Sequence, residues 1–156
     1  MKISIISVGK IKEDYLNIGI KEYIKRLKKY TDIEIVEISS QRILGNLSTD
    51  DILNKEKNKI EKNLPSNSFK ISLSENGTKI SSIEFAQRLN IIEKSGINKI
   101  FFIIGGHLGI HEEIIKNSNW NLSLSNMTFP YQIVRLILVE QLYRAFKINK
   151  SEPYHK

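Results

Sequence analysis

Apolar and polar positions alternate along this chain in two periods, one typical of strands and one typical of helices. Short apolar runs that end in glycine or polar residues indicate buried strands, and apolar residues three or four positions apart indicate amphipathic helices. The pattern predicts strands over 3–8, 33–38, 69–73, 99–104 and 120–124, and helices over 16–27, 48–64, 81–94, 110–117 and 133–148. Because strands alternate with helices throughout, we expect an α/β fold with a mostly parallel sheet covered by helices on both faces.

Local signals support several of these boundaries. Ser48 and Ser81 begin Ser-x-x-Asp and Ser-x-x-Glu sequences, the capping box that starts a helix. Pro65 and Gly96 then follow the two predicted helices, as expected of residues that end them. Residues 75–78, with the sequence Glu-Asn-Gly-Thr, predict a turn after the third strand.

Small and polar residues close two of the predicted strands. Gly105 and Gly106 come directly after 99–104, and the polar segment 123–128 closes the strand that begins at Trp120. Open α/β sheets bind ligands at the carboxyl ends of their strands, so we expect a pocket there. The sequence GGHLG matches neither common phosphate-binding fingerprint, but its glycines let the backbone approach a ligand closely.

The predicted helix 133–148 is apolar around most of its circumference. One small domain covers one side of such a helix easily, so coverage on the remaining sides points to a partner subunit. An isologous homodimer is the simplest arrangement. Within this helix Glu140 and Arg144 are spaced i, i+4, so we expect an ion pair there rather than a catalytic acid. Arg135 and Arg144 also have guanidinium groups suited to phosphate.

Composition narrows the function further. The 156 residues fit a single domain, 1–156, and the formal net charge of +7 favours a polyanionic partner, although a solubility surplus explains it equally well. The lysines of helix 16–27 are likewise either a solvated face or an RNA contact. The chain has no cysteine, which excludes disulfides, thiolate catalysis and the usual zinc sites. We expect no metal, because His107 and His111 straddle Gly109 outside any HExxH frame.

Two further features bear on location. The apolar run at the N-terminus is short and soon followed by charge, unlike a signal peptide. No apolar stretch approaches the roughly 20 residues of a membrane span. We therefore expect a cytoplasmic protein that does not bind membranes.

Four segments carry a resemblance to a known family. IIGGHLG, SLSNMTFP, VRLILVEQLYRAFKI and the terminal PYHK follow one another as in the small trefoil-knot (SPOUT) methyltransferases. In particular, the chain resembles the bacterial large-subunit (23S) rRNA pseudouridine N3-methyltransferase family over essentially its whole length. The resemblance implies a C-terminal trefoil knot, a homodimer and transfer of a methyl group from S-adenosyl-L-methionine to pseudouridine N3 in rRNA. Because a chain this small has little surface for reading an RNA sequence, we expect it to recognise shape on a pre-formed ribosomal surface, with the free subunit and the whole ribosome both open as substrates.

The resemblance also implies a cofactor site made by three segments. By position these are Leu73, Gly105, and the loop residues Leu124, Ser125, Asn126, Met127, Thr128 and Phe129. Their chemistry agrees, because adenine needs an apolar slot with backbone hydrogen bonds, and Gly105 leaves room for the ribose or the methionine part.

The acceptor side is expected to involve the tail and the last helix. We expect His155 to act as proton acceptor or base-edge contact, Tyr154 to stack and Lys156 to meet phosphate. Arg144 is expected to contact substrate or tether the tail, and Arg135 to bind substrate. The tail is expected to act in its own subunit or in the partner's pocket. Many relatives have histidine where this chain has Tyr131, so a role for that histidine cannot be transferred.

Two other classes of function remain open at this stage. A non-catalytic module that binds RNA or the ribosome needs only the basic charge. A nucleotide-dependent enzyme would use the glycine loop for ATP or NAD. Affinity for S-adenosylmethionine distinguishes the methyltransferase from both.

Overall fold

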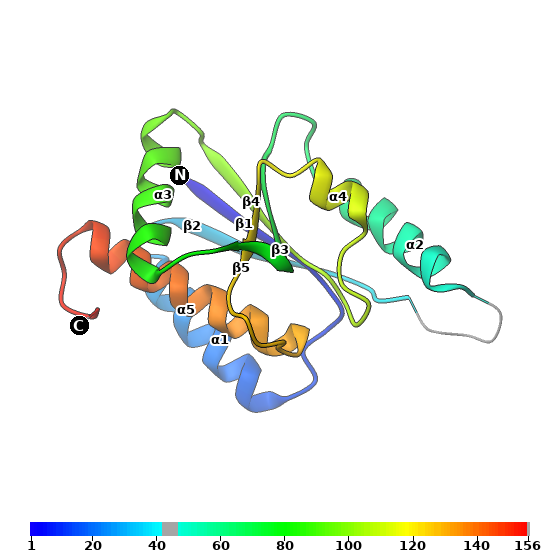
Figure 1. Ribbon diagram of the computed structural model, residues 1–156. Coiled ribbons are helices and arrows are strands. Elements are labelled where there is room, and N and C mark those ends of the chain that lie inside the picture. Colours follow the sequence, from blue (N-terminus) through cyan, green and yellow to red (C-terminus); the bar gives the residue numbers. More distant parts are fainter. Residues whose placement is uncertain (42–46, 156) are drawn as a thin grey trace.

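The computed structural model describes residues 1–41 and 47–155 (Figure 1). Its strands are β1 (Lys2–Val8), β2 (Asp32–Ile38), β3 (Phe69–Lys79), β4 (Lys99–Ile104) and β5 (Trp120–Ser123). Its helices are α1 (Asp14–Leu27), α2 (Thr49–Glu61), α3 (Ser82–Lys94), α4 (Glu112–Lys116) and α5 (Tyr131–Asn149). The strands form one sheet in the order β2-β1-β4-β3-β5, and all four pairings are parallel.

Helices cover both faces of this sheet. Because side chains alternate along a strand, Ile3 and Ile5 of β1 pack toward one face while Ile6 and Val8 pack toward the other. The first face carries α1, α3 and α5, and the second carries α2 and α4 through Ile60 and Ile114 (Figure 1). The predicted α/β class with a parallel, helix-covered sheet is confirmed.

Capping explains why α2 and α3 begin where they do. The side chains of Ser48 and Ser81 accept hydrogen bonds from the backbone N–H groups of Asp51 and Glu84. Each acidic side chain accepts a bond from the serine backbone in return, so both predicted capping boxes are present.

The predicted turn at 75–78 is wrong, because the chain stays extended there as part of β3. The pairing with β5 shifts within this segment, so that Leu73 and Thr78 are both paired with Leu122. The strand irregularity brings Gly77 against the β5 backbone, where a Cβ atom would lie 2.4 Å from the Leu122 carbonyl carbon. A contact between distant strands therefore overrides the local turn preference.

Candidate functional site

Three segments of the predicted cofactor site meet at the carboxyl edge of the sheet. Strand β3 lies between β4 and β5, and Leu73 is paired with Ile104 on β4 and with Leu122 on β5. Gly105 follows Ile104 directly, and the loop from Leu124 follows the end of β5. The sheet order therefore brings together residues that are far apart in sequence, at the edge where parallel sheets bind ligands.

The glycine loop after β4 is tightly folded. The N–H of Gly109 donates to the carbonyl of Gly106 at 3.1 Å, and Gly109 has a φ of +83°. A Cβ atom on Gly105 would lie 2.1 Å from the Gly109 carbonyl oxygen. Only glycine therefore fits at Gly105, and the backbone itself forms this wall of the site.

The loop before α5 has both internal bonds and free backbone groups. The Ser125 hydroxyl accepts from the N–H of Met127 at 2.9 Å, and its carbonyl accepts from the Ser123 hydroxyl at 2.9 Å. Asn126, Thr128 and Phe129 make no backbone hydrogen bond to any other residue within 1–41 and 47–155. Such free amide and carbonyl groups suit the polar edge of adenine.

The apolar residues of this site differ in exposure. Leu73 is buried and Leu124 and Phe129 are partly buried, so they suit the faces of a purine ring. Met127, expected to line the pocket, is 73 % exposed and extends from the loop. Gly105, Leu73 and the loop around residues 124–129 thus fit S-adenosylmethionine in the chemistry of their donors and apolar groups.

Tyr154 anchors the C-terminal tail to two helices. Its hydroxyl donates to Glu140 Oε1 of α5 at 3.1 Å and lies 3.2 Å from the Tyr23 hydroxyl of α1. Its ring packs edge-on against Tyr143, with centroids 4.9 Å apart. Burial, together with these hydrogen bonds, raises the pKa of Tyr154, so the phenol stays protonated at neutral pH.

Arg144 connects this anchor to His155. Its guanidinium forms the expected i, i+4 ion pair with Glu140, and that hydrogen bond raises the pKa of Arg144. Arg144 Nη1 lies 3.3 Å from Nδ1 of His155, whose side chain is otherwise exposed. The structure therefore brings Arg144, Tyr154 and His155 together, whereas Lys156 lies outside the described residues.

The tail cluster and the cofactor loops of one chain are far apart. Tyr131 begins α5 beside the loop 124–130, and Arg144 lies farther along the same helix, about 20 Å away at the usual helical rise. Figure 1 shows the C-terminus beyond the opposite end of α5 from this loop. The two halves of the predicted site therefore do not meet within one chain.

Arg135 is placed differently from the expectation that it binds substrate. Its side chain is 1 % exposed, forms an ion pair with Glu37 on β2 and donates to the carbonyl of Gly9 at 2.9 Å. A guanidinium held this way has a structural role, so we do not carry the expected substrate contact forward. Glu37, its partner, was not identified from the sequence.

Sequence reasoning also missed Glu56 of α2. Glu56 is buried, its Oε1 accepts from the backbone N–H of Gln41 at 3.0 Å, and its Oε2 faces Gly106 of the glycine loop. Burial raises the pKa of this carboxyl group. A signal was present, because Glu56 interrupts the i, i+4 apolar stripe of Ile52 and Ile60.

Two general features of the described chain complete the picture. Within residues 1–41 and 47–155, no cluster of three or more His, Cys, Asp or Glu side chains is arranged to hold a metal ion. No helix in this part of the protein has the length and apolarity needed to cross a membrane.

Comparison with solved structures agrees with this architecture. A tRNA methyltransferase from Aquifex aeolicus superposes with a TM-score of 0.58 at 16% identity, over 100% of this chain and 75% of that chain. A probable methylase family protein from Haemophilus influenzae superposes with a TM-score of 0.56 at 15% identity, over 99% and 70%. At such identities the similarity concerns the fold.

Comparison of sequences is more specific. A protein from Halothermothrix orenii named ribosomal RNA large subunit methyltransferase H is 47% identical over the full length of both chains. A protein of the same name from Bacillus cytotoxicus is 46% identical, again over both full lengths. Residues 1–155 match the family described as predicted SPOUT methyltransferase. The chain therefore belongs to the SPOUT methyltransferase family.

Proposed function

We propose that this protein transfers a methyl group from S-adenosylmethionine to the N3 ring nitrogen of a pseudouridine in large-subunit (23S) rRNA. Membership of the SPOUT methyltransferases makes it an S-adenosylmethionine-dependent enzyme. The observation that carries the proposal is the meeting of Leu73, Gly105 and the 124–129 loop at one edge of the sheet. The 46–47% identity over the full length to proteins named as ribosomal RNA large subunit methyltransferases supports large-subunit rRNA as the substrate.

The cofactor site is proposed to work by positioning. S-adenosylmethionine supplies an electrophilic methyl group on sulfur. Leu73, Leu124 and Phe129 would enclose the adenine, and the free backbone groups of the loop would bond its polar edge. The bare backbone at Gly105 would leave room for the ribose or the methionine part. Holding the donor and the acceptor nitrogen in line is the main contribution an enzyme makes to such a displacement.

On the acceptor side, the geometry favours His155 as a base-edge contact. A guanidinium only donates, so Nδ1 of His155 is the acceptor opposite Arg144. The hydrogen of a neutral ring then lies on Nε2, which would donate to a carbonyl oxygen beside N3. This supports the contact role over the role of proton acceptor, and the N3 proton would leave to water. Tyr154 would hold the tail, and Lys156 stays a prediction as a phosphate contact.

A homodimer would bring the two halves of the site together. Because the tail lies far from its own cofactor loops, we propose that His155 serves the site of the partner subunit. Partly buried apolar positions on α5, such as Ile133 and Ile137, and exposed Ile18 on α1 provide apolar surface for such an interface. We also propose that the trefoil knot typical of the SPOUT family is present, on the strength of the family match over residues 1–155.

The assembled ribosome is the proposed substrate, which also implies a cytoplasmic site of action. The decisive experiment measures transfer of labelled methyl groups to protein-free 23S rRNA, isolated large subunits and whole ribosomes that lack the modification. We expect labelling of pseudouridine N3, identified by mass spectrometry of nuclease digests, on ribosomes but not on free rRNA. Failure to label any of the three would contradict the proposal, and binding of ribosomes without affinity for S-adenosylmethionine would indicate a non-catalytic module.

A further inference from the structure

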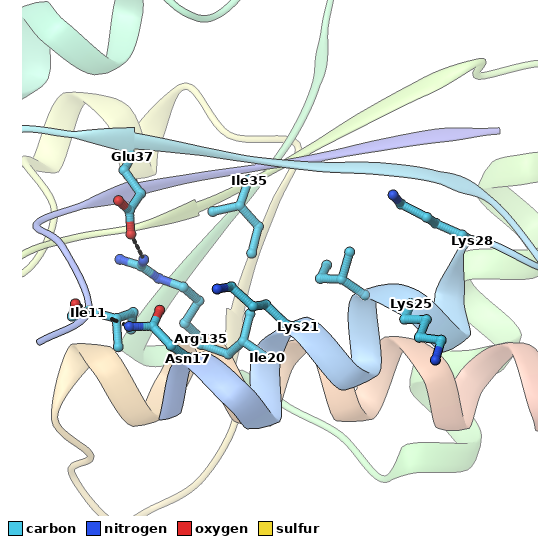
Figure 2. A pocket seen from close by; sticks show the side chains of 10 residues that line it. Ile11, Asn17, Ile20, Lys21, Lys25, Lys28, Ile35, Glu37 and Arg135 are labelled. Atoms are coloured by element: carbon cyan, nitrogen blue, oxygen red, sulfur yellow. Dashed lines mark hydrogen bonds and ion pairs between the residues drawn. The ribbon is translucent and has the colours of Figure 1, made fainter. Parts of the chain in front are cut away.

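An open groove of about 630 Å³ lies between α1 and the edge strand β2 (Figure 2). Its floor is apolar, formed by Ile20 and Ile24 of α1 and Ile35 of β2. Asn17 and Ile11 lie at one end, next to the Arg135–Glu37 ion pair. Nothing in the cofactor site or the tail cluster uses this groove.

Three lysines line the groove: Lys21 and Lys25 of α1, and Lys28, which directly follows this helix. Their spacing of four and three residues puts them on one side of the helix, with Cβ atoms about 5 to 6 Å apart. All three are exposed, and within the described residues none forms a salt bridge, whereas the neighbouring Arg26 is paired with Glu22. Like charges so spaced destabilise a helix slightly, so an anionic partner would relieve their repulsion.

The acidic group that lines the groove does not offset these charges. Glu37 is already neutralised by Arg135, which is buried beneath it. The groove therefore has a net positive charge of three. An occupant of the groove must therefore supply negative charge to offset the three lysines. Charge complementarity therefore selects a polyanion as the occupant.

We propose that this groove binds the ribose–phosphate backbone of an rRNA strand next to the methylation site. The proposal rests on the proposed function, since it identifies a second contact with the same substrate. Lysines at this spacing can contact successive phosphates, and the isoleucine floor can pack against ribose carbons. Such contacts position a nucleic acid without reading its sequence.

The position of the groove fits this role. Its Arg135 end lies at the carboxyl edge of the sheet, because that guanidinium bonds Gly9, which directly follows β1. Strand β1 is paired with β4, whose end carries the glycine loop. On the side of α1 toward α5, Tyr23 contacts Tyr154 of the tail. An RNA strand in the groove would therefore run from the carboxyl edge of the sheet toward the tail that is proposed to serve the partner subunit's site.

The test compares two triple variants of equal charge. The groove variant is Lys21→Gln/Lys25→Gln/Lys28→Gln. The control variant is Lys55→Gln/Lys62→Gln/Lys94→Gln, which removes three exposed lysines outside the groove: one in α2, one directly after α2 and one in α3. Binding to unmodified ribosomes and to protein-free 23S rRNA is measured between low and moderate salt, together with the KM for ribosomes and S-adenosylmethionine affinity. We expect the groove variant to bind both RNAs about tenfold or more weakly and to lower the salt slope by about two to three.

Each outcome decides one question. Equal binding and an equal salt slope for the groove variant and the wild type would overturn the proposal, even if methyl transfer proceeds. An equal loss of RNA binding in the control variant would overturn it as well. A raised KM for ribosomes with unchanged binding to protein-free rRNA would indicate that the groove contacts a ribosomal protein, and this result would also overturn the proposal. If the wild type transfers no methyl group, the proposed function fails, while the salt slopes still test the groove.

Discussion

Gly77 has no room for a side chain, and the sequence around it does not show why. It lies against the backbone of β5, more than 40 residues later in the chain, and a Cβ atom there would be 2.4 Å from the Leu122 carbonyl carbon and 2.7 Å from the Ser123 nitrogen. Backbone atoms cannot move aside as a flexible side chain can. The constraint at Gly77 is therefore one of space.

The first prediction compares two glycines. Gly77→Ala should lower the free energy of unfolding by about 3 kcal/mol, because the methyl group overpacks a backbone contact. Gly96→Ala should cost about 1 kcal/mol, since its Cβ would meet nothing and only its φ of +84° is unfavourable. Urea denaturation of both variants and the wild type measures the difference. Equal losses would show that β3 and β5 do not approach as described.

The ion pair of Arg135 with Glu37 is unequal in burial. Arg135 is 1 % exposed, while the Glu37 side chain is 37 % exposed. An unpaired buried cation is far more costly than an unpaired carboxylate that water can reach. The two partners should therefore respond differently to removal.

The second prediction follows from that asymmetry. Glu37→Ala should destabilise the protein by about 3 kcal/mol, because it leaves a buried guanidinium unpaired. Arg135→Met should cost less, about 1 to 2 kcal/mol, since it leaves Glu37 solvated and loses mainly the bond to Gly9. Urea denaturation of the two variants provides the comparison. A larger loss for Arg135→Met would contradict the structural role given to Arg135.

At the scale of elements, the tail after α5 is attached by several groups. Glu152 accepts hydrogen bonds from Lys147 of α5 at 2.6 Å and from the Tyr30 hydroxyl at 2.7 Å. These bonds, with that from Lys147 first, hold the pKa of Glu152 below its ordinary value. The tail is therefore an ordered extension of α5, although a short polar tail by itself predicts fraying.

The third prediction is a dependence on pH. Because the pKa of Glu152 is lower in the folded than in the unfolded protein, its stabilising contribution is present above its unfolded pKa of about 4.3 and is lost as the pH falls through the lower folded value. The difference in free energy of unfolding between the wild type and Glu152→Gln should therefore become smaller as the pH is lowered from about 6 to about 3, the range in which Glu152 becomes protonated. Denaturation series at both pH values measure it, and a constant difference would be inconsistent with the described contacts.

At the scale of the whole molecule, the proposed active site needs two chains. The sheet edge holds the proposed cofactor segments of one chain, and α5 carries the tail cluster away from them. A site that combines the loops of one subunit with the tail of the other has a specific signature in mixed dimers.

The fourth prediction uses that signature. His155→Ala removes the base-edge contact, and Asn126→Trp places a bulky ring on the exposed cofactor loop. Each variant alone should be inactive, with Asn126→Trp also losing affinity for S-adenosylmethionine. When the two are unfolded together and refolded at equal amounts, about a quarter of wild-type methyl transfer should return, because random pairing completes one site in each mixed dimer. No recovery, with mixed dimers verified by native mass spectrometry, would mean that the tail acts within its own subunit.

Local patterning was enough to find the elements. Strand β4 runs from Lys99 to Ile104 as predicted, and both capping boxes start their helices at the expected serines. The extended course of residues 75–78 was missed because a contact with β5 outweighs the turn preference of Asn-Gly. The cofactor segments were predicted through family resemblance and stay a prediction, whereas Glu37 and Glu56 were missed because their partners lie on other elements.

The sequence by itself determined the order of the strands and helices along the chain, the α/β class and the family, because periodicity, caps and short motifs are local properties. Only the tertiary structure decided that β3 lies between β4 and β5, that Arg135 is buried beside β2, and that the tail is anchored far from its own cofactor loops. Strand order and burial depend on contacts between segments distant in sequence, and no local pattern encodes them. For the same reason, only the tertiary structure shows that Lys21, Lys25 and Lys28 line a groove, because the other wall of the groove is β2.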